Sequence, residues 1–345
     1  MKSILPSFGK DVSIDIGTSI TRVMGGNRES MMSEPSIVAT DTKLEKIVAV
    51  GDEADRIVRR MPDMWRSLSL LQDGFIVDYR VMHTMLHYFL NKVSNSLRRS
   101  RVLVSVPCGM TDVEQRAMMD AVIQAGAKEV FLIEAPIAAA IGCDLPIFQP
   151  RGSMVIDIGE GTTDMAILSL GGTVQSQTIR FGGGDIDKAL MKYVNQCFGL
   201  LVSDQTITAI KHSIAIATPP LEEQEFSFQG RDMTNGIVRR SVIHQSEIYE
   251  VINNVLQGLL DAIKQMIRNT EPEIVADMME YGIVLTGGAA QLQGLPERIS
   301  AELGVPVQVA VNPDTKVVEG LQKAANNIVS LTRFIVNSKG RKGRA

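Results

Sequence analysis

The chain has 345 residues, and at roughly 150 residues per domain this length predicts two domains that can bury a core without disulfides or metals. Hydrophobic residues make up 45% and charged residues 21% of the chain, which excludes a disordered or collagen-like protein. The 35 Lys and Arg and the 39 Asp and Glu give a net charge of −4, which excludes a global nucleic-acid-binding surface.

The first half of the chain predicts a strand at residues 14–16 entering a glycine turn, then short strands near 37–39 and 47–50. We interpret residues 34–76 as a small insertion. Apolar residues at helical spacing predict a helix over 79–93. The remaining elements are a strand at 102–106, a helix from the capping box of Thr111 and Glu114 to Gly126, a strand at 130–133 and a helix from Pro136 to Gly142.

The second half begins with a similar hairpin, whose strands are predicted at 154–158 and 165–168. The later elements are a strand at 173–181, a glycine turn at 182–184, helices at 186–198, 204–217 and 247–268, strands and turns between 219 and 243, and a strand at 283–286 followed by helices. Strands that alternate with helices predict an α/β architecture with a mostly parallel sheet in each half.

The most informative feature is a repeat. Residues 12–19 read VSIDIGTS and residues 155–164 read VIDIGEGTTD. Glycine turns of this type cluster backbone N–H groups in a way that suits phosphate, and the hydroxyls of Thr18, Ser19, Thr162 and Thr163 add donors. Asp15 and Asp157 could hold Mg²⁺ through water molecules. One such hairpin would be unremarkable, but two facing copies favour a site that grips a polyphosphate from opposite sides.

Other motifs point less clearly to a site. There is no Walker motif, whereas the glycines at 182–184 and 287–288 lie at strand-to-helix turns where a helix N-terminus could face a nucleotide. His83 and His87 have metal-chelating spacing, but they lie opposite the apolar stripe of their helix, so we interpret them as a solvated face. The three cysteines are far apart in sequence, which favours a reducing, cytoplasmic setting without disulfides or a zinc site. No signal-peptide pattern or membrane-spanning apolar run is visible.

Four further motifs accompany the twin hairpins: SEPS at 33–36, DGFIVDY at 73–79, APIAAAIG at 135–142 and LTGG at 285–288. Over nearly its whole length the sequence resembles the bacterial actin MreB/Mbl family. The resemblance implies an actin-like (ribonuclease H-like) fold of two related domains, each with a small subdomain, and ATP with Mg²⁺ in the cleft between them. It places domain I at 1–148, with its small subdomain at 34–76. Domain II follows at 149–335, with a small subdomain at about 182–255 and a final helix that packs back on domain I, and a basic tail covers 336–345.

The resemblance also implies function. Family members polymerise into filaments at the inner face of the cytoplasmic membrane, where they control cell shape and organise wall synthesis. The expected partners are other copies of the chain, the membrane surface and cell-shape or wall-synthesis proteins. By position, the implied nucleotide ligands are Gly17, Thr18, Ser19, Asp157, Gly159, Gly161, Thr162, Gly183, Lys211, Gly287, Gly288 and Ala289.

The chain departs from the family pattern inside these motifs. Members usually carry Asn, Gly, Asp, Glu and Gly at the positions of Ile20, Glu160, Gly184, Thr208 and Ala289. The glutamate that orients the attacking water in the family is replaced by Ala135, and alanine cannot position water. We therefore expect a slow or inactive ATPase.

The alternatives are a working ATPase, in which Glu134 or Glu160 acts together with Thr162, and a non-polymerising nucleotide-dependent adaptor. Glu134 should face away from the family's catalytic position, because neighbouring side chains at a strand end point to opposite sides. Glu160 should lie close to the γ-phosphate and oppose its charge.

Membrane contact is expected from three basic or apolar segments. The loop at 94–101 carries Leu97, Arg98, Arg99 and Arg101, and anionic headgroups attract such arginines by about 1 kcal/mol each. The other segments contribute Ile4, Leu5 and Phe8 at the start and Lys339, Arg341, Lys342 and Arg344 in the tail. The equally weighted alternative is a solvated loop and a disordered tail.

Overall fold

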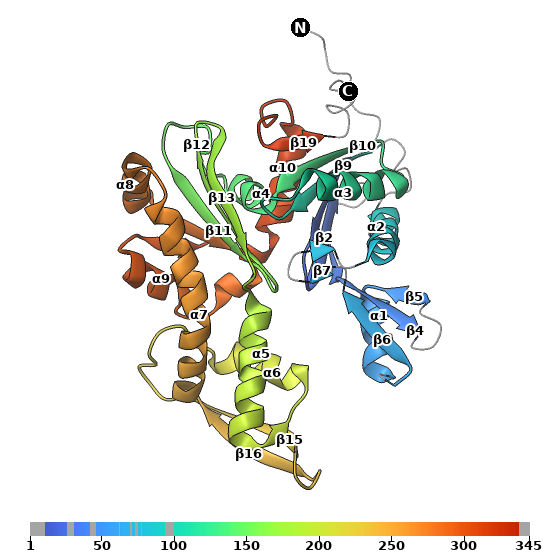
Figure 1. The fold of residues 1–345 in the computed structure, drawn as a ribbon, viewed down its shortest axis with the longest axis vertical. Coiled ribbons are helices and arrows are strands. Elements are labelled where there is room, and N and C mark those ends of the chain that lie inside the picture. The colour runs from blue at the N-terminus through green and yellow to red at the C-terminus, as the bar shows by residue number, and fades with distance from the viewer. Residues whose placement is uncertain are drawn as a thin grey trace.

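The computed structural model describes residues 11–25, 31–41, 46–61, 63–69, 71–72, 75–76, 78–93 and 100–337. Figure 1 shows two halves side by side, each built on its own sheet, with the last helix of the described residues, α10 (Lys316–Asn326), lying between them. Among the residues described, none of the helices combines the length and apolar character that crossing a bilayer requires.

The first half contains a six-stranded sheet of order β19-β10-β9-β1-β2-β3. Its strands are β1 (Val12–Ile16), β2 (Ile20–Gly25), β3 (Met32–Pro35), β9 (Arg101–Val106), β10 (Glu129–Glu134) and β19 (Ile335–Asn337). Strands β1, β9 and β10 run parallel, whereas β2, β3 and β19 pair antiparallel with their neighbours. The expectation of a mostly parallel sheet was therefore wrong, because a short turn such as the one between β1 and β2 can join only antiparallel strands.

The second half repeats this plan in a five-stranded sheet of order β13-β12-β11-β17-β18. Its strands are β11 (Ser153–Ile158), β12 (Thr163–Ser169), β13 (Gly172–Ile179), β17 (Ile283–Thr286) and β18 (Val307–Val309). The antiparallel pairs β13-β12-β11 and the parallel pairs β11-β17-β18 match β3-β2-β1 and β1-β9-β10 of the first sheet. The repeat seen in the two hairpins thus extends to both sheets, and here again the sheet is mixed.

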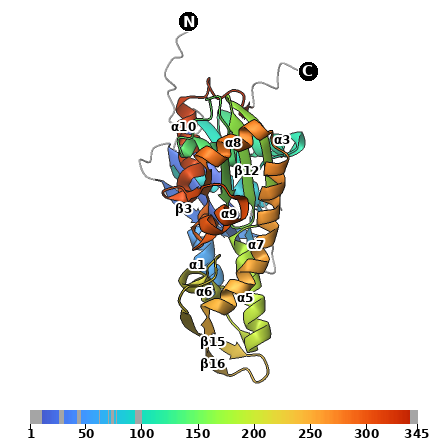
Figure 2. The same cartoon turned by 90° about the vertical axis from the view of Figure 1, so that its left-hand side faces the viewer.

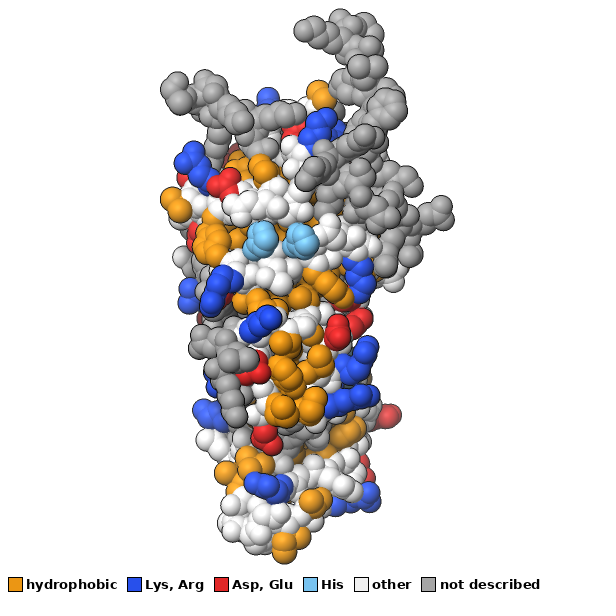
Figure 3. All heavy atoms as spheres, turned by 90° about the vertical axis from the view of Figure 1, so that its right-hand side faces the viewer, with side chains coloured by type: hydrophobic (Ala, Val, Ile, Leu, Met, Phe, Trp, Pro, Cys, Tyr) orange, Lys and Arg blue, Asp and Glu red, His pale blue; other side chains and the backbone are white. Residues whose placement is uncertain are grey.

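Helices α2 (Tyr79–Val93) and α3 (Asp112–Gln124) pack on one face of the first sheet. The apolar stripe of α2, including Met82, Leu86 and Phe89, is buried there against the sheet, so the predicted helix is confirmed. The capping box of Thr111 and Glu114 is also present at the start of α3. The opposite face of α2 carries His87, which is exposed, and His83, whose ring stacks on it 6.2 Å away. Figure 3 shows this histidine-bearing face at the surface.

The small insertion forms a sheet of order β5-β4-β6 covered by one helix. Its elements are β4 (Ile37–Asp41), β5 (Ile47–Val50), α1 (Asp52–Arg60) and β6 (Trp65–Ser69), with a separate pair, β7 (Leu71–Gln72) and β8 (Phe75–Ile76). The sequence analysis missed α1, because its apolar residues are few and only Ala54 is fully buried, against Ala39 and Ala49.

Buried Glu34 of the SEPS motif, in β3 of the first sheet, links α1 of the insertion to α2, and the backbone N–H of Asp52 donates to its carboxylate at 3.4 Å. Tyr88 donates a 3.0 Å hydrogen bond to its carboxylate, and Lys92 forms an ion pair with it.

The helices of the second half are α5 (Gly183–Tyr193), α6 (Asp204–Ile214), α7 (Gln245–Arg268), α8 (Pro272–Tyr281) and α9 (Leu295–Leu303). A π-helical turn (Val194–Phe198) continues α5, so the predicted 186–198 helix begins earlier and ends irregularly. A small sheet contains β14 (Leu200–Leu201), β15 (Glu225–Asp232) and β16 (Val238–His244). Figure 2 shows α7 running along the length of this half, and it buries Ile252, Leu256 and Leu259 in the core.

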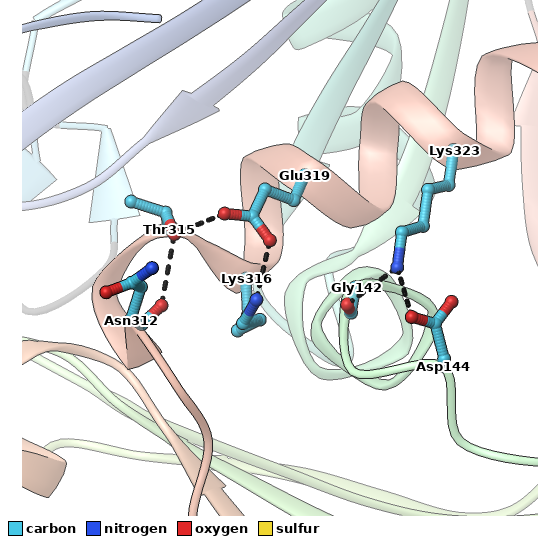
Figure 4. Close-up of polar contacts among 7 residues, drawn as sticks. All are labelled: Gly142, Asp144, Asn312, Thr315, Lys316, Glu319 and Lys323. Atoms are coloured by element: carbon cyan, nitrogen blue, oxygen red, sulfur yellow. Dashed lines mark hydrogen bonds and ion pairs between the residues drawn. The ribbon is translucent and has the colours of Figure 1, made fainter.

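Helices α4 (Ala135–Gly142) and α10 (Lys316–Asn326) pack between the two sheets. Their backbones touch where they cross, because a Cβ added to Gly320 would lie 1.7 Å from the carbonyl oxygen of Ala138. Lys323 of α10 donates to the carbonyl of Gly142 at 2.9 Å and pairs with Asp144 at 2.7 Å (Figure 4). The halves are thus joined at a close helix crossing.

Two expected membrane segments lie outside the described residues, namely the chain start and the tail from residue 338. Of the loop at 94–101, only Ser100 and Arg101 are described. Arg101 begins β9 and forms an ion pair with Asp11. Counting it as a free loop arginine was therefore wrong, since its charge is already partnered.

Candidate functional site

A cavity of about 470 Å³ lies between the two halves. It brings together nearly all of the sequence-predicted site residues, namely Asp15, Gly17, Thr18, Ser19, Asp157, Gly159, Glu160, Thr162, Gly183, Lys211, Gly287, Gly288 and Ala289. Three predicted site residues do not line it, namely Gly161, Glu134 and Thr163. The expectation for Thr163 was wrong, because its buried hydroxyl donates to the carbonyl of Phe181 at 2.9 Å. The cavity therefore gathers segments that are far apart in the sequence.

The two hairpin turns have the same hydrogen bond across them. The N–H of Gly17 donates to the carbonyl of Ile20 at 3.2 Å, and the N–H of Gly159 donates to that of Thr162 at 2.9 Å. The turns also meet, since a Cβ at Gly161 would lie 2.8 Å from the hydroxyl oxygen of Thr18. Gly161 is therefore needed where the two turns pass each other, which explains why it lies behind the cavity wall rather than on it.

One end of the cavity is acidic. Asp15 accepts a 2.6 Å hydrogen bond from the Ser105 hydroxyl, and Asp157 accepts a 2.7 Å bond from the Thr286 hydroxyl. Asp164 accepts from the Thr178 hydroxyl and from the backbone N–H of Cys108.

Burial raises the pKa of all three of these carboxyls, that of Asp157 to about 7 and that of Asp164 to about 6. Because burial disfavours the charged carboxylates, a bound cation would stabilise them.

This donor set suits Mg²⁺ held through water. In the part of the chain that the structure describes, no three acidic, histidine or cysteine residues lie close enough to hold a metal directly. Mg²⁺ usually keeps several water ligands and uses only one or two carboxylates, so Asp15 and Asp157 fit the predicted role.

The sequence analysis did not include Asp164 or Arg22 in the site, although both line the cavity. Asp164 pairs with Asp157 across the hairpin, so the alternation of β11 and β12 could have revealed that their side chains share a face. Arg22 forms a 2.8 Å ion pair with Asp314, which comes from the short 3₁₀ helix (Pro313–Thr315) before α10. No local sequence signal marks this pair, since it joins residues 292 positions apart.

The other end of the cavity is built around the glycines at the start of α5. The N–H of Gly183 donates to the carbonyl of Gly159 at 2.9 Å, and that of Gly184 donates to the carbonyl of Glu160 at 2.8 Å. A Cβ at Gly183 would lie 2.8 Å from a carboxylate oxygen of Glu160, 3.5 Å from the Ala289 Cβ and 3.7 Å from the Lys211 Nζ. Glu160, Lys211 and Ala289 therefore converge on Gly183.

Charges at this end are partly balanced. Lys211 forms a 2.7 Å ion pair with Asp187 of α5. Burial raises the pKa of Glu160, and the positive charge of Lys211 opposes that rise. The structure places the Glu160 carboxylate against the first turn of α5, which was not foreseen from its place in the phosphate hairpin.

The position at which the resemblance implies a catalytic glutamate is on the cavity wall. Ala135, the first residue of α4, lines the cavity, whereas Glu134, the last residue of β10, does not. The alternation of neighbouring side chains at a strand end predicts this difference. Ala135 contributes no group that could position a water molecule.

Comparisons with known proteins agree with the resemblance seen in the sequence. A family model described as MreB/Mbl protein matches residues 9–333. The chain belongs to the MreB/Mbl family.

The cell shape-determining protein Mbl of Bacillus subtilis (strain 168) is 37% identical over 328 residues, which cover 94% of this chain and 98% of Mbl. The cell shape-determining protein MreB of Escherichia coli (strain K12) is 39% identical over 335 residues, which cover 95% and 96% of the two chains.

Solved structures show that the fold of this MreB/Mbl family member is actin-like. MreB5 of Spiroplasma citri bound to ADP has a TM-score of 0.88 and 27% identity, covering 94% of this chain and 98% of its own. The same protein bound to AMPPNP has a TM-score of 0.87. A MamK double helical filament has a TM-score of 0.75 at 21% identity, covering 92% and 98% of the two chains, and supports the fold alone.

Proposed function

We propose that this chain binds ATP with Mg²⁺ in the cleft and polymerises into cytoskeletal filaments that control bacterial cell shape. The observation that carries the proposal is the meeting of the two hairpin turns, one from each half, over a cavity lined by the predicted nucleotide ligands. MreB5, which shares the fold, was solved with ADP and with AMPPNP. The names of Mbl and MreB support the role in cell shape.

In this proposal each part of the cavity has its own task. The turns at Gly17–Ser19 and Gly159–Thr162 bind the phosphates with backbone N–H groups and hydroxyls. Asp15 and Asp157 orient the water ligands of Mg²⁺, which neutralises phosphate charge when bound. Lys211 and the segment Gly287–Ala289 contact the nucleoside.

Hydrolysis is slow or absent in this proposal because Ala135 cannot orient water. Loss of such a group typically costs about 10²–10⁴-fold in rate. The alternative is an ATPase in which Thr162 acts with Glu134 or Glu160. The position of Glu134 outside the cavity lining and of Glu160 against α5 disfavours that alternative.

We further propose that the filaments lie in the cytoplasm at the inner face of the membrane and organise wall-synthesis proteins. Self-association is supported by large apolar side chains that are exposed on the small subdomain, namely Val48, Met61, Met64 and Leu68. Exposed apolar groups that gather in one place typically mark interaction surfaces. The alternative is a nucleotide-dependent adaptor that stays monomeric.

The test uses the purified full chain. We expect Mg²⁺-dependent ATP binding in equilibrium titration, sedimentable filaments visible by electron microscopy, and little phosphate release during assembly. Failure to bind ATP would refute the proposal. Persistent monomers across salt and lipid conditions would favour the adaptor, and turnover at the rate of MreB from Escherichia coli, assayed in parallel, would favour the enzyme.

A further inference from the structure

The acidic end of the cavity also contains a positive charge, the guanidinium of Arg22. In the antiparallel pair of β1 and β2, Arg22 lies directly opposite Asp15. In the equivalent pair of β11 and β12, Asp164 lies directly opposite Asp157. Directly opposed residues share one face of a sheet, and all four line the cavity. The two hairpins thus present equivalent positions to the cavity, but the first has an arginine where the second has an aspartate.

The Arg22 side chain is held in place while part of its guanidinium lacks a partner. It is 17% exposed and forms its 2.8 Å ion pair with Asp314. Asp314 is fixed in turn, because the carbonyl of the neighbouring Pro313 accepts a 2.8 Å hydrogen bond from the N–H of Gly287. Among the described residues, the buried Nε of Arg22 has no hydrogen-bond partner. Since buried donors are normally satisfied and a guanidinium suits phosphate, Arg22 retains capacity for an anionic ligand.

The charge of Arg22 acts on both halves of the cleft. Burial raises the pKa of Asp15 in the first half and of Asp157 in the second, and the positive charge of Arg22 opposes that rise at both. These are the two carboxylates that fit the water ligands of Mg²⁺. Two positive charges beside the same anions repel each other. Arg22 and Mg²⁺ are therefore competing sources of positive charge at this end of the cavity.

We propose that Arg22 is a resident cation that supplies part of the positive charge which Mg²⁺ otherwise brings to the nucleotide phosphates. The cleft then depends less on Mg²⁺ than it would with an uncharged residue at position 22. This inference rests on the proposed ATP binding and deepens it by naming a residue that sets the metal requirement.

The experiment measures the equilibrium affinity of the full chain for ATP in saturating Mg²⁺ and in EDTA, at protein concentrations below those that give sedimentable filaments. The measured quantity is the ratio of the two affinities, because a merely structural role would lower both affinities by the same factor. In Arg22→Gln the preference for Mg²⁺ should rise by about tenfold or more, as for loss of hydrogen bonds to a charged group.

Two further variants serve as controls. Arg22→Lys keeps the positive charge, so its ratio should stay near that of the wild type. Arg240→Gln neutralises an exposed arginine of β16 outside the cavity lining and should leave the ratio unchanged. Thermal unfolding shows whether each variant is folded, and Arg22→Met provides a second uncharged variant if Arg22→Gln is not.

Three outcomes overturn the inference. An unchanged or lower ratio in a folded, uncharged variant removes the role of Arg22 as a cation while ATP binding stands. An equal rise in Arg22→Lys and Arg22→Gln would show that charge at this position does not set the metal requirement. Absence of ATP binding by the wild type in both conditions overturns the proposed function together with the inference.

Discussion

Among the glycines that the structure describes, Gly320 at the crossing of α4 and α10 leaves the least room for an added methyl group. A Cβ at position 320 would lie 1.7 Å from the carbonyl oxygen of Ala138 and 2.8 Å from the backbone nitrogen of Gly142. Both neighbours are backbone atoms, so no rotamer change can relieve the overlap. Because non-bonded heavy atoms do not approach within about 3 Å, Gly320→Ala must separate the helices by more than ~1 Å.

Two opposing contributions set the expected change in the free energy of unfolding in Gly320→Ala. Overpacking of a tight core costs about 1–3 kcal/mol and occasionally more, and this crossing is at the upper end because both helices are held between two sheets. Replacing glycine by alanine inside a helix returns about 1 kcal/mol. We therefore expect Gly320→Ala to lower the free energy of unfolding by about 2 kcal/mol or more.

Urea denaturation of the purified chain provides the assay, and Gly258→Ala is the matched control. Gly258 is an exposed glycine inside α7, and a Cβ there would meet nothing within 4 Å. The same substitution should therefore stabilise by about 0.5–1 kcal/mol at position 258. Equal effects at positions 320 and 258 would refute the backbone crossing.

Three further outcomes are expected. Ala135→Glu should raise phosphate release by about 10²-fold or more, whereas Ala135→Gln should not; equal rates in both variants and the wild type would show that this position does not control hydrolysis. Asp164→Asn should flatten the pH dependence of stability. Burial raises the pKa of this carboxyl from its ordinary value of 3.8 to about 6 in the folded chain. The native state therefore retains the proton, and the carboxyl's contribution to the free energy of unfolding falls as pH rises from 4 to 6. In denaturation experiments, the free energy of unfolding of the variant minus that of the wild type should rise by up to about 3 kcal/mol from pH 4 to pH 8. A fall in this difference would contradict the expected sign. Replacing Arg98 and Arg99 by serine should weaken cosedimentation with anionic vesicles and leave ATP affinity unchanged, while unchanged vesicle binding would exclude the loop as an anchor.

The sequence predicted the fold where a local pattern determines it. The apolar spacing of α2, the capping box of α3 and the twin hairpins each depend on residues within one element, and all three are present. Helix α1 was missed because the insertion is small and buries one alanine of that helix fully, which leaves few apolar residues to mark it in the sequence. The parallel sheets were predicted wrongly because alternation of helices and strands does not specify the partners of each strand.

The sequence predicted the two backbone turns of the site better than the contacts that its side chains make. Glycine spacing marked both turns, and the cavity contains them. The ion pair of Arg22 with Asp314 and the packing of Glu160 on α5 depend on the docking of distant segments. A side chain as long as glutamate can reach several subsites from one backbone position, so its role could not be derived from the hairpin alone.

Two departures from the family pattern, Glu160 and Gly184, lie in contact and are expected to compensate each other. A Cβ at Gly184 would lie 3.2 Å from a Glu160 carboxylate oxygen, so the aspartate usual in the family would place two carboxylates together. Like charges at this distance disfavour ionisation of both. Gly184→Asp alone should therefore weaken ATP binding by about tenfold, a cost of about 1.4 kcal/mol.

The double variant Glu160→Gly with Gly184→Asp should recover most of this loss, because the carboxylate is then supplied from α5 instead of the hairpin. Equilibrium titration of the two single variants and the double variant gives the coupling energy between the positions. Additive losses in the double variant would show that the two departures are independent. A positive coupling would mean that the chain has moved one carboxylate from the helix to the phosphate hairpin while keeping a single acidic group at this end of the cleft.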